Sequence, residues 1–237
     1  MDFVKVKAHI GTARRKAEVT VTIPTRPVRP SRLTPMLRRM MDAAVDAASD
    51  GVAVTCSKGC GDCCSQMVPL RRMEARRLAA MVERMEEPRR TEILGRFAAA
   101  RERLAAAAML DAVERPREQG DLDWEEFALR YFHLGIPCPF LEDGSCSIYA
   151  ERPLVCREFL VTSDPKHCRR PEDKLVDIVP VPSVGGAVRV IEREAQPEED
   201  PWVLLVHALA WVAARPEESA GPVDAREFLR QVMEKLR

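Results

Sequence analysis

The sequence predicts a mainly α-helical α+β protein with two small β-hairpins, in which helices frame a cysteine-rich metal-binding loop region. Apolar residues recur at helical spacing through most of the chain. Alternation with a period of two is confined to short segments beside Gly or Pro. The eight cysteines all lie between positions 56 and 168, so both ends of the 237-residue chain lack them.

The composition is that of an ordinary globular protein, with 46% hydrophobic and 31% charged residues. Lys plus Arg and Asp plus Glu each total 37, so the formal net charge is zero and binding of nucleic acid by bulk phosphate neutralisation is not expected. The first residues lack an apolar stretch of signal-peptide length, and the longest apolar run, 202–214, is too short to span a bilayer. We therefore expect a cytoplasmic protein with no membrane partner and no strong nucleic-acid signal.

The chain begins with an expected β-hairpin. Alternating apolar residues over 3–10 and 18–23 predict two strands, joined by a turn at 11–16. The proline- and arginine-rich segment 24–35 then predicts a stiff linker with a solvated basic face. These two features make up the N-terminal part, 1–34.

Helices are expected through the middle of the chain. Helical spacing of apolar residues predicts helices over 36–48, 70–85 and about 89–113. Asp123 with Glu126 forms a capping box for a further short helix that ends before Gly135. With the cysteines, these helices make up a metal-binding domain over 35–170.

The C-terminal part, 171–237, is expected to hold a hairpin and two helices that pack on that domain. Apolar segments 175–184 and 187–191 flank Gly185-Gly186, which is a hairpin signal. An almost wholly apolar helix is then predicted from Asp200 to Arg215, followed by a final amphipathic helix from Asp224 through Leu236.

The cysteines form two groups along the chain. The first group is the run Cys56, Cys60, Cys63 and Cys64, and the second comprises Cys138, Cys146, Cys156 and Cys168. In a reducing compartment, clustered thiols bind metal more often than they form disulfides. Glycines within the first run allow the sharp backbone turns that a metal knuckle requires. The pattern therefore predicts a metal ion or cluster bound by these thiolates.

The identity of the metal stays open between an iron–sulfur cluster and zinc. Three thiolates in one tight loop, at Cys56, Cys60 and Cys63, are typical of a cubane cluster, and Cys138-Pro139 is similar to the Cys-Pro of ferredoxin-type motifs. Four plus four cysteines are equally suited to two tetrahedral zinc ions. Adjacent side chains diverge, so Cys63 and Cys64 are expected to serve different metals or different irons. An iron–sulfur cluster is the first expectation and zinc the alternative.

The order of these residues resembles the YkgJ-type cysteine-cluster family, which is described as a zinc- or iron-chelating domain. The resemblance rests on Cys-x3-Cys-x2-Cys-Cys, Cys138-Pro-Phe-Leu, Cys146-Ser-Ile-Tyr149 and Arg152-Pro-x2-Cys156-Arg157, and covers about 56–168. It implies a bacterial cytoplasmic protein. It also implies metal ligands at Cys56, Cys60, Cys63, Cys64, Cys138, Cys146 and Cys156, while Cys168 is placed less securely by it.

A related group, the flagellin lysine N-methylases, has a similar cysteine cluster, so the resemblance also admits a cluster-dependent methyl-transfer or redox enzyme. The competing hypothesis is a metal or cluster carrier, or a structural metal domain that docks a protein partner. Tyr149, Arg152 and Arg157 are the candidate cofactor-binding residues. Tyr149 is expected to pack over the site and Arg152 to offset thiolate charge, with substrate contact as the sharper alternative.

Other polar residues have simpler interpretations. Asp62 is expected to be a turn residue and His167 a solvated loop residue beside Cys168. His133 lies at the expected C-terminus of a helix, where its charge is favourable. His207 lies in an apolar segment and is expected to be a hydrogen-bonded core residue.

Overall fold

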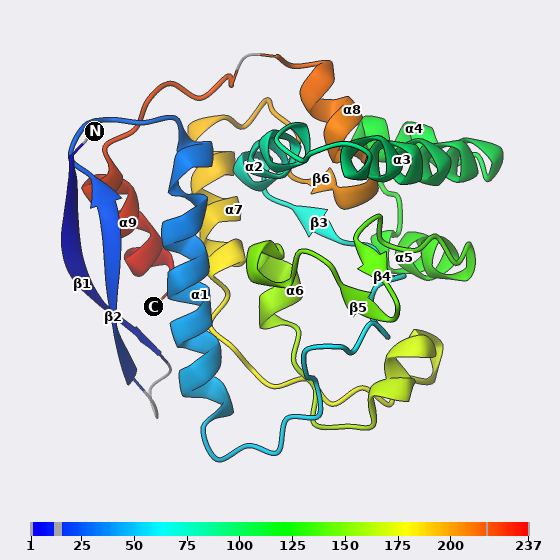
Figure 1. Ribbon diagram of the computed structural model, residues 1–237, viewed down its shortest axis with the longest axis horizontal. Coiled ribbons are helices and arrows are strands. Elements are labelled where there is room, and N and C mark those ends of the chain that lie inside the picture. The colour runs from blue at the N-terminus through cyan, green and yellow to red at the C-terminus, as the bar shows by residue number, and fades with distance from the viewer. Residues whose placement is uncertain (1, 12–15, 217, 237) are drawn as a thin grey trace.

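A computed structural model describes residues 2–11, 16–216 and 218–236 of the chain. It has the predicted class, with helices dominating and small antiparallel two-stranded sheets between them. The hairpin of β1 and β2 lies at one side against α1, whereas α3, α4 and α5 extend on the other side (Figure 1). The buried side chains accordingly form two clusters, one on each side of the molecule.

The N-terminal hairpin confirms the first prediction. Strand β1 (Phe3–Gly11) pairs antiparallel with β2 (Lys16–Pro24), with Val6 opposite Val21. Alternate side chains along the strands point inward, so that Val21 and Ile23 are fully buried. Residues 12–15 of the predicted turn lie outside the described residues.

The segment 24–35 was predicted as a stiff linker with a solvated basic face. Its basic face is exposed at Arg26, Arg29 and Arg32, as predicted, but its apolar side chains pack into the protein. A 3-10 turn, η1 (Pro30–Leu33), leads directly into α1 (Thr34–Ser49), with Pro35 in the first helical turn. Val28 forms an isolated bridge with Val223, and Leu33 is buried. The prolines therefore shape a tight corner whose apolar side chains enter the core.

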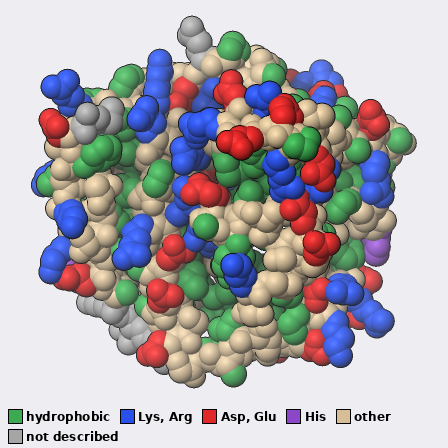
Figure 2. Space-filling view, viewed as in Figure 1, with side chains coloured by type: hydrophobic (Ala, Val, Ile, Leu, Met, Phe, Trp, Pro, Cys, Tyr) green, Lys and Arg blue, Asp and Glu red, His purple; other side chains and the backbone are tan. Residues whose placement is uncertain are grey.

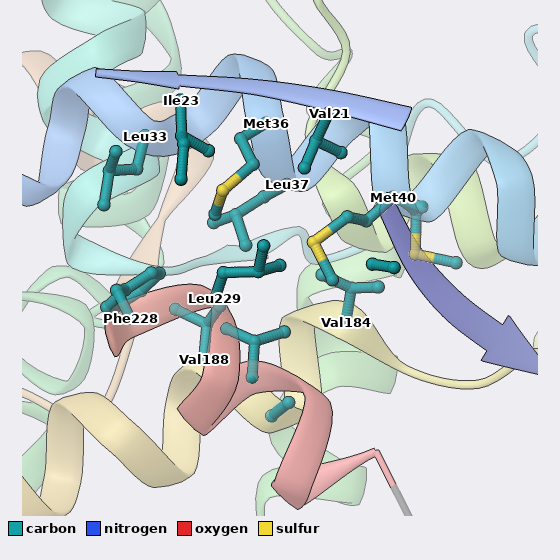
Figure 3. Close-up of a cluster of buried hydrophobic side chains, with 14 of the residues drawn as sticks. Val21, Ile23, Leu33, Met36, Leu37, Met40, Val184, Val188, Phe228 and Leu229 are labelled. Atoms are coloured by element: carbon teal, nitrogen blue, oxygen red, sulfur yellow. The ribbon is translucent and has the colours of Figure 1, made fainter. Parts of the chain in front are cut away.

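The first core joins the N-terminal hairpin to α1 and to two helices of the C-terminal part of the chain. Leu37 and Met40 of α1 lie in one buried cluster with side chains of β2, of α7 (Val184–Ala195) and of α9 (Ala225–Lys235). Figure 3 shows Val188 of α7 and Leu229 of α9 pointing into the same cluster. Burial of this continuous apolar surface is what fixes the hairpin against the helices.

The second core lies among the helices that follow the cysteine run. These are α2 (Arg72–Glu83), α3 (Arg89–Ala106), α4 (Leu110–Glu114) and α5 (Trp124–His133). As predicted, the Asp123 side chain caps α5, accepting hydrogen bonds from the N–H groups of Glu125 and Glu126. The long predicted helix 89–113 is interrupted: α3 ends at Ala106, and Ala108 has a φ of +54°, which breaks the helix before α4.

The hairpin predicted around Gly185-Gly186 is wrong, because this segment forms α7. Ser183 caps the helix by accepting a 2.8 Å hydrogen bond from the Gly186 N–H. Val184, Ala187, Val188 and Ile191 then fall at i, i+3, i+4 and i+7 and are all buried. The apolar stripe and its cap outweigh the turn preference of the two glycines.

The apolar segment after Asp200 is a helix only in its second half. Its first residues form β6 (Val203–Leu204), which pairs antiparallel with β3 (Pro69–Leu70), and then η6 (Leu205–His207). Helix α8 (Ala208–Ala213) follows, and α9 is capped by Asp224 as predicted. A run that is apolar on every side suits a buried strand as well as a helix.

The remaining elements are short. They comprise β4 (Leu141–Glu142), β5 (Ser145–Cys146), α6 (Leu154–Glu158), η2 (Pro116–Gln119), η3 (Tyr149–Glu151), η4 (Pro165–Arg169) and η5 (Pro171–Asp173). None of the helices in the described residues is long and apolar enough to cross a membrane. Basic and acidic side chains are interspersed over the face seen in Figure 2.

Candidate metal centre

The first cysteine run is a loop of consecutive tight turns that follows α1. The Cys60 N–H donates to the Ser57 carbonyl, and the Cys64 N–H donates to the Gly61 carbonyl at 2.9 Å. Gly59 has a φ of +103°, which only glycine adopts without strain. These turns hold four cysteines within one compact segment.

The second cysteine group begins with a small hairpin made by β4 and β5. Its turn places Asp143 and Gly144 at positive φ, and Cys146 pairs with Leu141 across the strands. The sulfur of Cys138 accepts a hydrogen bond from the backbone of Phe140, and the sulfur of Cys146 accepts one from the backbone of Ile148. Such N–H donors two residues after a cysteine stabilise a thiolate.

The loop and the hairpin are in direct contact. The Cys138 N–H donates a 2.7 Å hydrogen bond to the Cys64 carbonyl. A Cβ atom at Gly61 would lie only 2.5 Å from the carbonyl oxygen of Gly144 and 2.7 Å from Cδ1 of Leu141. A residue without a side chain is therefore required at Gly61 for this close approach.

Helix α6 brings Cys156 toward the same region. Its first N–H, from Leu154, donates a 2.8 Å hydrogen bond to Oε1 of Glu74, a buried residue of α2. The other oxygen of Glu74 accepts from the Arg71 N–H at 3.1 Å. A single carboxylate thus caps the N-termini of both α2 and α6.

The last cysteine, Cys168, is buried in η4, and this segment is fastened to the cysteine loop. The side chain of Gln66 donates to the Cys168 carbonyl at 3.2 Å, and Arg169 forms an ion pair with Asp62. Just before η4, the Val161 N–H donates to the sulfur of Cys56 at 3.3 Å. Figure 1 shows the two loop regions running together below α6.

Electrostatic interactions among the thiols divide into two overlapping sets. In one set, Cys168 interacts with Cys63, Cys56 and Cys60, and Cys56 interacts with Cys60 and Cys63. In the other set, Cys64 and Cys156 both interact with Cys138 and Cys146. Cys63 takes part in both sets. All eight predicted cysteines therefore lie in one neighbourhood, and no disulfide joins any of them.

Most of these thiols are held in their neutral form when no cation is present. Burial, together with the neighbouring thiols, raises the pKa of Cys138 to about 12 and the pKa of Cys168 to about 11. Burial also raises the pKa of Cys156 well above its usual range. Cys63 differs from these three, because the hydrogen bond from the Cys64 thiol lowers its pKa to about 7. A bound metal cation would reverse the raised values and release protons.

The donors suit a soft metal, but their side chains are not arranged as a finished coordination sphere. Thiolates are the ligands preferred by zinc and by iron–sulfur clusters. Among the described residues, no group of three or more His, Cys, Asp or Glu side chains is arranged so as to hold a metal ion. The backbone thus gathers the thiols into one neighbourhood without placing their sulfurs around one point.

The predicted cofactor-binding residues border the cysteines. The guanidinium of Arg152 lies 4.1 Å above the ring of Tyr149. Burial raises the pKa of Cys56 and of Cys146, and the Arg152 charge offsets part of this rise. The same charge contributes to the lowered pKa of Cys63. Arg157 is buried and donates to the carbonyls of Ala150 and Arg152 and to Asp42 of α1. The contacts made by Arg157 fasten α6 to α1.

The histidines differ in their surroundings. His207 is only 5% exposed and accepts a hydrogen bond at Nδ1 from Arg101, which confirms the prediction of a hydrogen-bonded core residue. Burial lowers the pKa of His207 to about 4. His133 is exposed at the end of α5 and His167 is half-buried in η4.

A cleft of about 720 Å³ opens beside the first cysteine set. Cys60 and Asp62 line it on one side, and Phe132, His133 and Arg169 line it elsewhere. This cleft is a route by which a solute or a partner surface could reach Cys60. Phe132 and His133 come from α5, which is remote in sequence from the cysteine run.

Several residues that position the cysteines carry no signal in the sequence. Glu74 accepts from the Leu154 N–H at the start of the helix of Cys156, and Gln66 donates to the Cys168 carbonyl. Val161 donates to Cys56 through its backbone alone. Contacts of this kind depend on tertiary structure and leave no local pattern. By contrast, Gly59 and Gly61 belong to the cysteine motif that the sequence singles out.

Comparison with known proteins bears on the same stretch of chain. Searches of curated proteins and of solved structures find no match to the chain. Residues 55–174 match the family CxxCxxCC, described as "Putative zinc- or iron-chelating domain". The match covers half of the chain and spans all eight cysteines, although here three residues separate the first two, Cys56 and Cys60. The chain therefore belongs to the CxxCxxCC family of zinc- or iron-chelating domains.

Proposed function

We propose that this protein binds metal through its eight cysteines as two adjoining four-thiolate sites. The observation that carries the proposal is the convergence of two cysteine segments, joined by the hydrogen bond from Cys138 to Cys64 and by the close approach of Gly61 to Gly144. Separate segments that meet with every cysteine unpaired are typical of a metal site in a reduced protein.

The electrostatic sets indicate how the ligands would divide. The first site takes Cys56, Cys60, Cys63 and Cys168, and the second takes Cys64, Cys138, Cys146 and Cys156. The expectation that the adjacent side chains of Cys63 and Cys64 diverge is wrong, because the two thiols are hydrogen-bonded to each other. Cys63 is assigned to the first site by its interactions with Cys56 and Cys168, so the two sites adjoin at Cys63 and Cys64. Binding of the metal would have to reorient the thiol side chains, because no group of them among the described residues is already arranged around one point.

The surroundings favour retention of charged thiolates. Four thiolates around a divalent metal leave an excess of negative charge, which needs nearby cations and N–H donors. Arg152 interacts with thiols of both sets, and N–H groups of Val161, Phe140 and Ile148 point to three sulfurs. The first candidate for the bound group is an iron–sulfur cluster, because one tight loop supplies three thiolates. The alternative is zinc.

Anaerobic purification followed by measurement of iron, zinc and acid-labile sulfide per chain tests this proposal. Iron with sulfide supports a cluster, whereas two zinc ions per chain without sulfide supports a pair of tetrahedral sites. Failure to retain or take up either metal would contradict metal binding by these cysteines.

The division into two sites is tested by measuring the metal content of Cys168→Ser and of Cys146→Ser. His167→Asn, next to Cys168, is the control variant for both. If zinc is bound, each cysteine variant loses about one of two ions and the double variant loses both. The control keeps its full content. Loss of all metal in each single variant would show one shared site instead of two.

A second candidate function is catalysis at a protein-bound iron–sulfur cluster, and the cleft beside Cys60 favours this function. A substrate could reach the edge of the first site there, near His133 and Arg169. A cluster-dependent methyl-transfer or redox enzyme would need such access and an open coordination position. Calorimetric titration of the iron-loaded protein with S-adenosylmethionine tests it, and the absence of binding would leave the carrier or structural role.

A further inference from the structure

Strand β1 is the outer strand of the N-terminal hairpin, and one of its edges has no neighbour. Among the described residues β1 pairs only with β2, and their sheet contains these two strands alone. In Figure 1, β2 lies between β1 and α1, so that β1 is the strand farther from this helix. An unpaired edge presents a row of N–H and C=O groups to which another strand can bind.

The register of the hairpin identifies the backbone groups at this edge. The Thr25 N–H donates a 3.1 Å hydrogen bond to the Asp2 carbonyl, and these two residues extend the strand register by one pair. Hydrogen-bonded and non-hydrogen-bonded pairs alternate in an antiparallel ladder, so Phe3 and Pro24 form a pair of the second kind. Pro24 suits such a pair because proline has no N–H. Continuing the alternation, the N–H and C=O groups that point away from β2 belong to Phe3, Lys5, Lys7 and His9.

A cleft of about 700 Å³ runs between β1 and α9. Consecutive residues of β1 line one side of it, whereas β2 contributes no described residue to its wall. The inward-facing residues Val6, Ala8 and Ile10 line it together with Leu229 and Met233 of α9. The cleft therefore offers an apolar space to side chains on the inner face of a strand added beside β1.

The outer face of the same edge is basic. Lys5, Lys7 and His9 share this face and are exposed, because alternate side chains of a strand point the same way. In the described part of the chain these three residues have one carboxylate near them, that of Glu18, which pairs with Lys7 and His9 but not with Lys5. None of the described residues that line the cleft is acidic, and Arg226 at the cleft is exposed. An acidic segment therefore complements this edge.

A second copy of β1 does not suit the edge. Two β1 strands joined in an antiparallel pair would bring the residues with outward-pointing backbone groups opposite one another. Registers that pair most of the strand then place Lys7 of one copy opposite Lys7 of the other, or Lys5 opposite Lys7. Like charges directly opposite each other are destabilising.

From these observations we infer that the free edge of β1 binds an extended segment of another protein in which acidic and apolar residues alternate. The segment adds to the hairpin as an antiparallel third strand. Its acidic side chains lie beside Lys5 and Lys7, and its apolar side chains enter the cleft toward Leu229 and Met233. The site shares no residue with the proposed metal centre and does not depend on it.

Isothermal titration calorimetry with capped octapeptides of alternating glutamate and valine tests the inference. Directly opposite residues of an antiparallel pair place their side chains on one face, so the glutamate N–H groups point to β1 and the valine N–H groups point to solvent. A peptide N-methylated at its valines should bind and cannot stack on itself. N-methylation at the glutamates instead should weaken binding about tenfold or more, because it removes the donors to β1.

The charge preference is tested with the valine-methylated peptide that carries lysine in place of glutamate. It should bind at least about tenfold more weakly than the glutamate peptide, since like charges would lie opposite each other. Equal or reversed affinities in either comparison, or no binding of the valine-methylated glutamate peptide, would overturn the inference.

Proline variants locate the binding. Lys7 and Thr20 form a pair without ladder hydrogen bonds, so proline at either position keeps the pairing of β1 with β2. Lys7→Pro should weaken binding of the valine-methylated glutamate peptide about tenfold or more, and Lys7→Gln, which keeps the N–H, should lose less. Thr20→Pro, at the opposite edge of the hairpin, is the matched control and should bind as the parent does. Equal loss in the two proline variants would overturn the assignment.

Amide hydrogen exchange of the parent protein tests the location without any substitution. The peptide should slow exchange at Lys5, Lys7 and His9 about tenfold or more, because their N–H groups become hydrogen-bonded. The Thr20 amide should be unchanged. Slowing at Thr20 or in other segments, with none in β1, would overturn the inference.

Discussion

The backbone N–H of Cys138 donates a 2.7 Å hydrogen bond to the carbonyl oxygen of Cys64. This bond joins the last cysteine of the first run to the first cysteine of the second group. Because it uses backbone atoms, both sulfurs stay available to a metal. The two halves of the proposed centre are therefore assembled by main-chain contacts, and the predictions below test the parts that hold them.

Gly61→Ala should separate the cysteine loop from the β4–β5 hairpin. The added methyl group would lie 2.5 Å from the Gly144 carbonyl oxygen, so the backbone must shift. We expect a loss of about 1–3 kcal/mol in the free energy of unfolding and a lower metal content. Urea denaturation and metal analysis check both effects.

The matched control for that variant is Gly95→Ala, at a position in α3 where a Cβ atom meets nothing within 4 Å. Helix propensity should make it more stable by about 0.5–1 kcal/mol. Normal metal content in Gly61→Ala would show that the close approach is not needed for binding.

Glu74→Gln should destabilise the protein although it changes only one atom. The carboxylate accepts N–H donors of Leu154 and Arg71, and an amide would present its own N–H groups to one of them. We expect a loss of about 1–3 kcal/mol, measured by urea denaturation. Cys156 lies in the helix that Glu74 caps, so metal affinity should fall too.

Glu83→Gln, at an exposed position of the same helix, is the control and should change stability by less than about 0.5 kcal/mol. Equal stability of the Glu74 and Glu83 variants would mean that the shared cap contributes little to the fold.

His207 should make the protein less stable in mild acid. Burial and the Arg101 charge lower its pKa to about 4, whereas the unfolded value is near 6.5. Between these values the unfolded chain takes up a proton that the folded protein excludes. Stability contributed by neutral His207 is thus complete above pH 6.5 and is lost as the pH falls toward 4, by about 3 kcal/mol at most.

The measurement compares urea denaturation of the parent and of His207→Asn at several pH values. Asparagine keeps an acceptor for Arg101 and does not titrate, so the difference between the two proteins isolates His207. This difference should change in favour of the variant as the pH falls from 7.5 to 4.5. A difference independent of pH would contradict the lowered pKa.

Ser183→Ala should weaken α7 at its first turn. The Ser183 hydroxyl accepts the Gly186 N–H, and loss of such a cap costs about 1 kcal/mol. Ser183→Asp keeps an acceptor and should recover most of that loss. Thermal or urea denaturation of the two variants checks the effect, and equal stability of Ser183→Ala and the parent would show that the helix forms without this cap.

The elements that were predicted correctly carry their signal within a few residues. The N-terminal hairpin alternates with period two, α1 carries a helical apolar stripe, and Asp123 and Asp224 are followed by helices that they cap. Local signals of this kind report backbone preferences directly. The three-part division at 34 and 170 stays a prediction.

The errors occurred where tertiary contacts outweigh local preference. Gly185-Gly186 has the preferences of a turn, yet it begins α7 because the following apolar residues are buried against α1 and α9. Val203–Leu204 lies in a strand because β3 offers it a partner. Val28 and Leu33 of the predicted linker pack inward, although the arginines between them stay exposed, because Val28 pairs with Val223. No local sequence pattern identifies these partners, because they lie far away along the chain.

By itself, the sequence determined the available chemistry: eight cysteine thiols in an order that matches a metal-chelating family, with glycines where a loop must turn. Ligand type and spacing are covalent properties, so they can be read without a fold. Only the tertiary structure decided which thiols are neighbours, that Glu74 caps the helix of Cys156, and that a cleft between β1 and α9 lies apart from them. These relationships join segments distant along the chain, and they exist only after burial of both apolar cores has fixed the helices in place.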